Sequence, residues 1–160
     1  MFYRQLLGSE FDRLPPVLRD LHGRAGRRQA TGTATLQRLP GLLPRIVGFP
    51  PSTANAPVLL EIVVADDHEV WIRRFANTVR RSVQRASAGS MVETFGLLRL
   101  QFGVTAVGSE IQYSLQRASF LGLPLPLQIQ AAERALASSW EFEVTVAHIG
   151  SYRGRMELIA

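Results

Sequence analysis

Residues 102–115 read FGVTAVGSEIQYSL, and this stretch decides the fold class. Gly108 and Ser109 form a two-residue loop, and glycine at the first position of such a loop suits a type II′ turn. In the resulting register the apolar residues of both strands share one face, as correct pairing requires. These residues are Phe102, Val104 and Ala106 on one strand and Ile111, Tyr113 and Leu115 on the other. The stretch therefore predicts a β-hairpin in an antiparallel sheet with one buried face.

Strand patterns recur along most of the chain. β-Branched or alternating apolar residues lie between turn signals, a pattern typical of strands. The predicted strands are residues 27–38, 58–65, 69–75, 78–86, 97–107, 110–119, about 127–138, 140–148 and 152–159. The short links between them predict an antiparallel meander. For the last hairpin, a three-residue loop over 148–150 predicts that Phe142 lies opposite Met156.

The N-terminal segment, residues 1–26, has a helical pattern. Its first apolar residues recur at helical spacing, and Pro16 suits the first turn of a further helix. Gly23 is placed to end that helix in the left-handed conformation. A short helix is expected near residues 39–48, where two prolines interrupt an apolar run.

These elements predict an α+β fold in one domain that spans residues 1–160. Residues 27–160 form a strongly curved antiparallel sheet, or a partly closed barrel, of about eight to ten strands. The N-terminal helices are expected to pack on the concave face of that sheet or to plug it.

Composition excludes several classes of protein. Hydrophobic residues make up 46% of the chain and charged residues 19%, which excludes a disordered chain. There is no cysteine, so disulfides and thiol chemistry are absent. No apolar run reaches the roughly 18 residues of a membrane-spanning helix, and the location is expected to be cytoplasmic. The net charge is +5, but the chain lacks nucleic-acid recognition motifs, so a nucleic-acid partner is not predicted.

Two arginines fall in rows of residues expected to face the concave side of the sheet. Arg73 lies between Trp71 and Phe75 in one predicted strand. Arg117 continues the row of another strand, which contains Tyr113. Both guanidinium groups are therefore expected to point inward.

A buried arginine without a partner is costly. Each of these arginines is expected to pair with a carboxylate such as Glu93 or Glu133, to reach the rim of the sheet, or to contact an anionic or polar ligand. The last alternative defines a candidate ligand site, whose residues are Arg73, Arg117, Trp71, Tyr113 and Phe75.

The sequence contains no motif that indicates a particular reaction. The three histidines lack metal-ligand spacing, and Ser90 lacks the glycines of a nucleophile elbow. No catalytic residue, cofactor or metal site is predicted. The leading hypothesis is binding of a small lipophilic or acidic ligand in the concavity. The alternatives are an interaction module whose helices fill the concavity, and an enzyme on a lipid-like substrate that uses Tyr113, Glu93 or His148.

Several short stretches together resemble a known bacterial family over nearly the whole chain. They are FYRQLLG at 2–8, Phe11, LP at 14–15, LH at 21–22, GFP at 48–50, WIRRF at 71–75, ETFG at 93–96 and GLPLP at 122–126. The chain is similar in these stretches to the uncharacterised domain-of-unknown-function family 4166. Its members occur alone or fused to NAD(P)-binding epimerase or saccharopine-dehydrogenase-like domains. The resemblance implies an accessory domain, with such a dehydrogenase-like domain as a candidate partner. It supplies no established activity and no catalytic residues to carry over.

Overall fold

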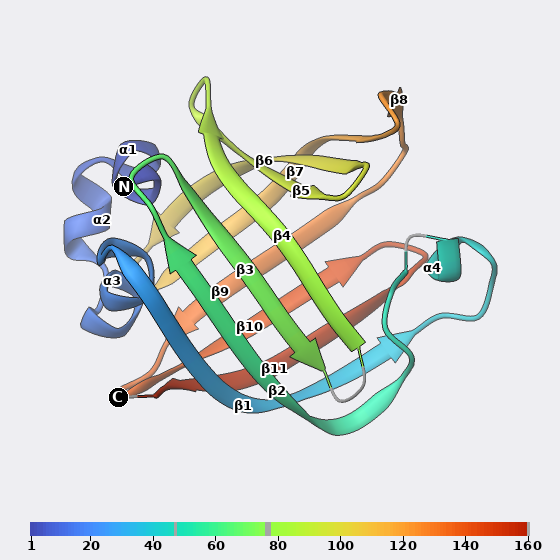
Figure 1. Ribbon diagram of the computed structural model, residues 1–160, viewed down its shortest axis with the longest axis horizontal. Coiled ribbons are helices and arrows are strands. Elements are labelled where there is room, and N and C mark those ends of the chain that lie inside the picture. Colours follow the sequence, from blue (N-terminus) through green and yellow to red (C-terminus); the bar gives the residue numbers. More distant parts are fainter. Residues whose placement is uncertain (47, 76–77, 160) are drawn as a thin grey trace.

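Ten strands form one antiparallel barrel in the computed structural model, which describes residues 1–46, 48–75 and 78–159 (Figure 1). The strands pair in the order β6-β5-β4-β3-β2-β1-β11-β10-β9-β7, and pairing between β6 and β7 closes the barrel. Their bounds are β1 Gly26–Arg38, β2 Thr53–Val64, β3 His68–Phe75, β4 Thr78–Ser87, β5 Ser90–Phe95, β6 Leu98–Val107, β7 Glu110–Phe120, β9 Ile129–Ala135, β10 Ser139–Val146 and β11 Gly150–Leu158. The two-residue β8, Leu123–Pro124, pairs with the end of β7.

The two ends of the barrel differ. Helices α1 (Phe2–Leu7), α2 (Ser9–Arg13) and α3 (Pro16–Gly23) lie together at one end, which we call the closed end (Figure 1). The opposite end, which we call the open end, carries the β1–β2, β3–β4, β5–β6, β7–β9 and β10–β11 connections. The first of these connections contains helix α4, Leu43–Ile46. Among the described residues, no helix is long and apolar enough to span a membrane.

The N-terminal helices fill the closed end with apolar side chains. The fully buried ones are Phe2, Tyr3, Phe11, Leu18 and Leu21. Gly23 is the last residue of α3, but it does not adopt the predicted left-handed conformation. Glycine is needed there for packing instead, since a Cβ would lie 2.8 Å from Cζ of Phe11.

The predicted sheet or barrel of eight to ten strands is confirmed, whereas the predicted α+β class and helix placement hold only in part. The fold is largely β with four short helices. Helices α1–α3 cover one end of the barrel and send side chains into it, so they do not lie along a concave sheet face. The predicted short helix near 39–48 corresponds to α4, and Val47 within that prediction lies outside the described residues.

The hairpin of residues 102–115 has the predicted register, with Val104 opposite Tyr113 and Phe102 opposite Leu115. The predicted inward direction of Arg117 is wrong. The pairing shifts by one residue next to Phe102, so that Gln101 lies opposite Arg117. This bulge reverses the faces of all later residues in β7, and Arg117 is exposed.

The last hairpin shows a second difference. Its loop has three residues, as predicted, but it spans 147–149, and Phe142 therefore lies opposite Gly154. The observed register is two residues away from the predicted one, which leaves every side chain on its predicted face. Packing explains the choice, because a Cβ on Gly154 would lie only 2.7 Å from Cζ of the Phe142 ring.

Strand β5 was not predicted. Its first four residues, Ser90, Met91, Val92 and Glu93, are all buried, so the strand lacks the alternation that marks a half-buried strand.

Candidate functional site

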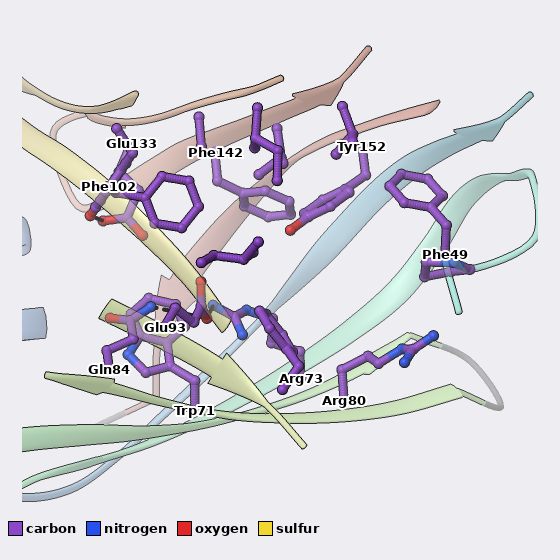
Figure 2. A pocket seen from close by; sticks show the side chains of 18 of the residues that line it. Phe49, Trp71, Arg73, Arg80, Gln84, Glu93, Phe102, Glu133, Phe142 and Tyr152 are labelled. Carbon is purple, nitrogen blue, oxygen red and sulfur yellow. Dashed lines mark hydrogen bonds and ion pairs between the residues drawn. The ribbon is translucent and has the colours of Figure 1, made fainter. Parts of the chain in front are cut away.

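The barrel encloses a cavity of about 210 Å³ that is partly open to solvent (Figure 2). Its lining includes Phe49 and Leu127 from the connections at the open end and no residue of α1–α3. The cavity therefore opens away from the helices. A cavity of about 150 Å³ with apolar walls is known to bind benzene, so this one has room for a ring or a short alkyl chain.

Four of the five residues predicted for a ligand site line this cavity. Trp71, Arg73, Phe75 and Tyr113 lie in its wall, whereas Arg117 lies outside the barrel. The four come from β3 and β7, which are distant in the order of strands, and closure of the barrel makes them face one interior.

Arg73 has a carboxylate partner, one of the alternatives that the sequence left open. Its Nη2 donates to Oε1 of Glu93 at 3.1 Å, and its Nη1 donates to Oγ of Ser82 at 2.9 Å. The Ser82 hydroxyl donates to the same Glu93 oxygen at 2.6 Å. The guanidinium also lies over the Trp71 ring, 4.5 Å from its centre. Arg73 is thus held in place before any ligand binds.

A second charged cluster lies deeper, toward the closed end. His22 of α3 is fully buried between two carboxylates. Its Nδ1 lies 3.2 Å from Oε2 of Glu69 on β3, and its Nε2 lies 2.9 Å from Oε2 of Glu133 on β9. Two hydrogen bonds complete the cluster: Trp71 Nε1 donates to Glu69 at 2.8 Å, and Tyr113 donates to Glu133 at 3.1 Å. We call His22, Glu69 and Glu133 the histidine clamp.

The clamp keeps His22 protonated. Burial opposes the charge on the imidazole, but the two carboxylates outweigh burial and raise the pKa of His22 to about 10. Both ring nitrogens then carry protons, and each donates to one carboxylate. Because those carboxylates lie on opposite sides of the ring, the three groups cannot converge on one ion. Within the described residues, no group of histidine and carboxylate side chains is placed to hold a metal ion.

Tyr3 connects the two charged clusters. Its hydroxyl lies 3.0 Å from the Tyr113 hydroxyl and 3.2 Å from Oε1 of Gln84. The Gln84 amide donates in turn to Glu93 at 3.2 Å. Burial and the nearby carboxylates raise the pKa of Tyr3 and of Tyr113, so both phenols stay protonated donors. One hydrogen-bonded network therefore runs from the helices to the cavity.

Arg80 and Tyr152 are two further polar residues of the cavity wall. Among the described residues, no ion pair or side-chain hydrogen bond is formed by Arg80 or by the Tyr152 hydroxyl. Arg80 lies directly opposite Arg73 in the β3–β4 pair, and a Cβ on Gly48 would overlap its guanidinium. Tyr152 is surrounded by aromatic rings, and its hydroxyl points into the cavity (Figure 2). These two groups can therefore meet a ligand without breaking an internal bond.

Sequence reasoning missed the histidine clamp. His22 lies in the last turn of α3, and its partners lie 47 and 111 residues away along the chain. The signal was the apolar setting of His22, which follows Leu18 and Leu21 on the buried face of α3. Of the residues considered for an enzyme, Tyr113 and Glu93 line the cavity within the network, whereas His148 is exposed in the β10–β11 loop.

Residues 14–156 match a protein family described as a domain of unknown function (DUF4166). No curated protein and no solved structure matches the chain.

The charge of His22 predicts how stability depends on pH. Its pKa is about 10 in the folded protein and near the ordinary value of 6.5 in the unfolded chain. The clamp therefore stabilises the fold fully below about pH 6.5, and this contribution is lost as pH rises toward 10. We expect urea unfolding to show a falling free energy of unfolding over this range, with a slope of up to about 1.4 kcal/mol per pH unit.

The matched variants are His22→Gln and His68→Gln, since His68 lies at the surface of the β2–β3 turn. His22→Gln should be destabilised by about 3–5 kcal/mol, because two buried carboxylates lose their cation, and should lack the slope. His68→Gln should retain it. A wild-type stability that stays constant between pH 6.5 and 10 would contradict the assignment.

Proposed function

This chain belongs to the DUF4166 family of domains of unknown function, and we propose that it binds a small lipophilic molecule inside its barrel. The observation that carries the proposal is the cavity, with apolar walls and an opening at one end. Ligand cavities in barrels are generally apolar and contain a few polar groups that orient the ligand. The alternative of an interaction module requires helices that fill the concavity, whereas α1–α3 leave the cavity free.

The walls supply the apolar contacts. Aromatic rings surround the cavity from several strands and from the β1–β2 connection, and they include Phe49, Phe75, Phe95, Phe102 and Phe142. Aromatic side chains bury a large area with few rotatable bonds, so they bind an apolar body at a small entropic cost.

The charges indicate where an acidic group of the ligand would lie. The interior network contains three carboxylates, Glu69, Glu93 and Glu133, against two cations. A ligand carboxylate placed beside them would be repelled. Arg80 is in no ion pair among residues 1–46, 48–75 and 78–159, and it lies in the wall near the open end. An acidic ligand would therefore bind with its apolar body inside and its anion at Arg80, and the Tyr152 hydroxyl would donate a second hydrogen bond.

This orientation replaces the role predicted for Arg117 and changes the one predicted for Arg73. Arg117 is outside the cavity. Arg73 forms an ion pair with Glu93, and this pair holds two residues of the wall in place. An NAD(P)-binding dehydrogenase-like partner and a cytoplasmic location remain proposals that rest on the sequence.

The cavity proposal predicts that filling the barrel abolishes binding. Ala131 lines the cavity, and its neighbour Gln130 on β9 is exposed on the outer face. We expect Ala131→Phe to lose binding of octanoic acid, because its ring occupies the space of the ligand, and Gln130→Phe to bind like the wild type. Binding is followed by tryptophan fluorescence, since Trp71 and Trp140 both line the cavity.

Native mass spectrometry and organic extraction of the purified protein supply an independent readout. A small lipophile that leaves with the wild type and is missing from a folded Ala131→Phe variant supports the proposal. Equal binding by the two β9 variants, or no binding of octanoic acid and no extracted molecule, would reject it.

The orientation proposal predicts a loss that depends on the ligand's charge. Arg80→Gln should weaken octanoate binding about tenfold or more, the equivalent of one charge-assisted hydrogen bond. Binding of 1-octanol, which lacks the carboxylate, should change little. Arg81→Gln is the control, because Arg81 is the exposed neighbour on β4. Equal losses for acid and alcohol would show that Arg80 does not recognise the anion.

A further inference from the structure

Exposed apolar residues gather at the open end of the barrel. Eight of the eleven large hydrophobic side chains that are exposed among the described residues belong to its connections or to adjoining strand residues. They are Leu39, Leu42, Leu43, Val79, Leu97, Phe120, Leu121 and Leu123. Leu42 and Leu123 are 71% and 70% exposed, so these side chains cover no core. We call this set the apolar rim.

The same end carries almost exclusively positive charge. Its connections, taken with the three strand residues on either side, contain six arginines and one carboxylate. The carboxylate is Glu93, which points inward and pairs with Arg73. The other five arginines are in no ion pair among the described residues: Arg38, Arg45, Arg74, Arg80 and Arg99.

The closed end has mixed charge. Helices α1–α3 contain three carboxylates, Glu10, Asp12 and Asp20, and three arginines, Arg4, Arg13 and Arg19, and the β2–β3 turn adds Asp66 and Asp67. The net charge of +5 is therefore distributed unevenly, with its positive part around the mouth of the cavity. In Figure 1 the helices and α4 lie at opposite ends of the barrel.

We propose that the open end docks on the surface of an anionic lipid membrane, with the apolar rim inserted among the lipids and the arginines on their phosphates. Interfacial binding of this kind requires apolar side chains flanked by basic residues, and it strengthens with both. The proposal goes beyond ligand binding, because it stands on the outer surface. It also gives a route for a lipophile, since the cavity opens at the docked end and the ligand need not cross water.

Co-sedimentation of the full chain with vesicles tests the proposal. We expect binding to vesicles of mixed phosphatidylcholine and phosphatidylglycerol, weaker binding at high salt, and little binding to phosphatidylcholine alone. The triple variant Leu42→Ser, Leu121→Ser and Leu123→Ser should lose most of the binding. The double variant Arg45→Glu and Arg99→Glu should bind at least about tenfold more weakly.

Matched controls come from the closed end. Val107→Ser removes an apolar side chain that is 60% exposed in the β6–β7 hairpin, and Arg19→Glu with Arg24→Glu reverses two charges near the helices. Both controls should bind vesicles like the wild type. Equal losses in the controls, or no preference for the anionic lipid, would overturn the proposal.

Two further measurements distinguish membrane docking from association between copies of the chain and from ligand binding. If sedimentation velocity shows a dimer that the rim variants dissociate, and vesicles do not bind, the rim is a contact between copies of the chain and the membrane proposal fails. Octanoic acid binding without vesicles should be unchanged in all four variants, because none of them alters the cavity lining. A wild-type protein that binds octanoic acid but not anionic vesicles would reject docking alone, and one that binds these vesicles but not octanoic acid would reject only the ligand proposal.

Discussion

One buried cation, His22, is the interaction on which the rest of the barrel depends. A charge without water is tolerated only when opposite charges and hydrogen bonds replace the lost solvation. Glu69 and Glu133 supply both, and they come from strands that are far apart in the sheet order. The clamp therefore fixes α3 against both β3 and β9. Tyr3 of α1 joins the same network, so polar groups inside the barrel hold both α1 and α3 in place.

This arrangement makes the two ends of the barrel different. The helices and the histidine clamp occupy one end, and the cavity with its aromatic walls and the Arg73–Glu93 pair lies beyond them. Arg80, which is in no ion pair among the described residues, lies near the mouth. A ligand is therefore admitted from one side and meets polar groups in a set order. The outer surface also differs along the barrel axis, because the helices carry charges of both signs while arginines and exposed leucines surround the mouth.

The sequence predicted what depends on local periodicity. The alternation of Phe102, Val104 and Ala106 identified a buried strand face, and the loop at Gly108 determined its register. It could not predict what depends on contacts across the barrel. The bulge that turns Arg117 outward cannot be recognised from the alternation of apolar and polar residues in the sequence. The buried strand β5 shows no such alternation at all. The clamp was missed because a histidine and carboxylates so distant in sequence become neighbours only after the barrel closes.

The charge of His22 is tested most directly by nitrogen NMR of the imidazole rings at pH 8, with the His22 signals assigned by their loss in His22→Gln. We expect both ring nitrogens of His22 to carry protons at this pH, each with the chemical shift of an imidazolium donating to a carboxylate. A neutral ring, with one unprotonated nitrogen at pH 8, would contradict it. The closed end would then be held by neutral hydrogen bonds, and the charge distribution that directs a ligand's anion toward Arg80 would be different.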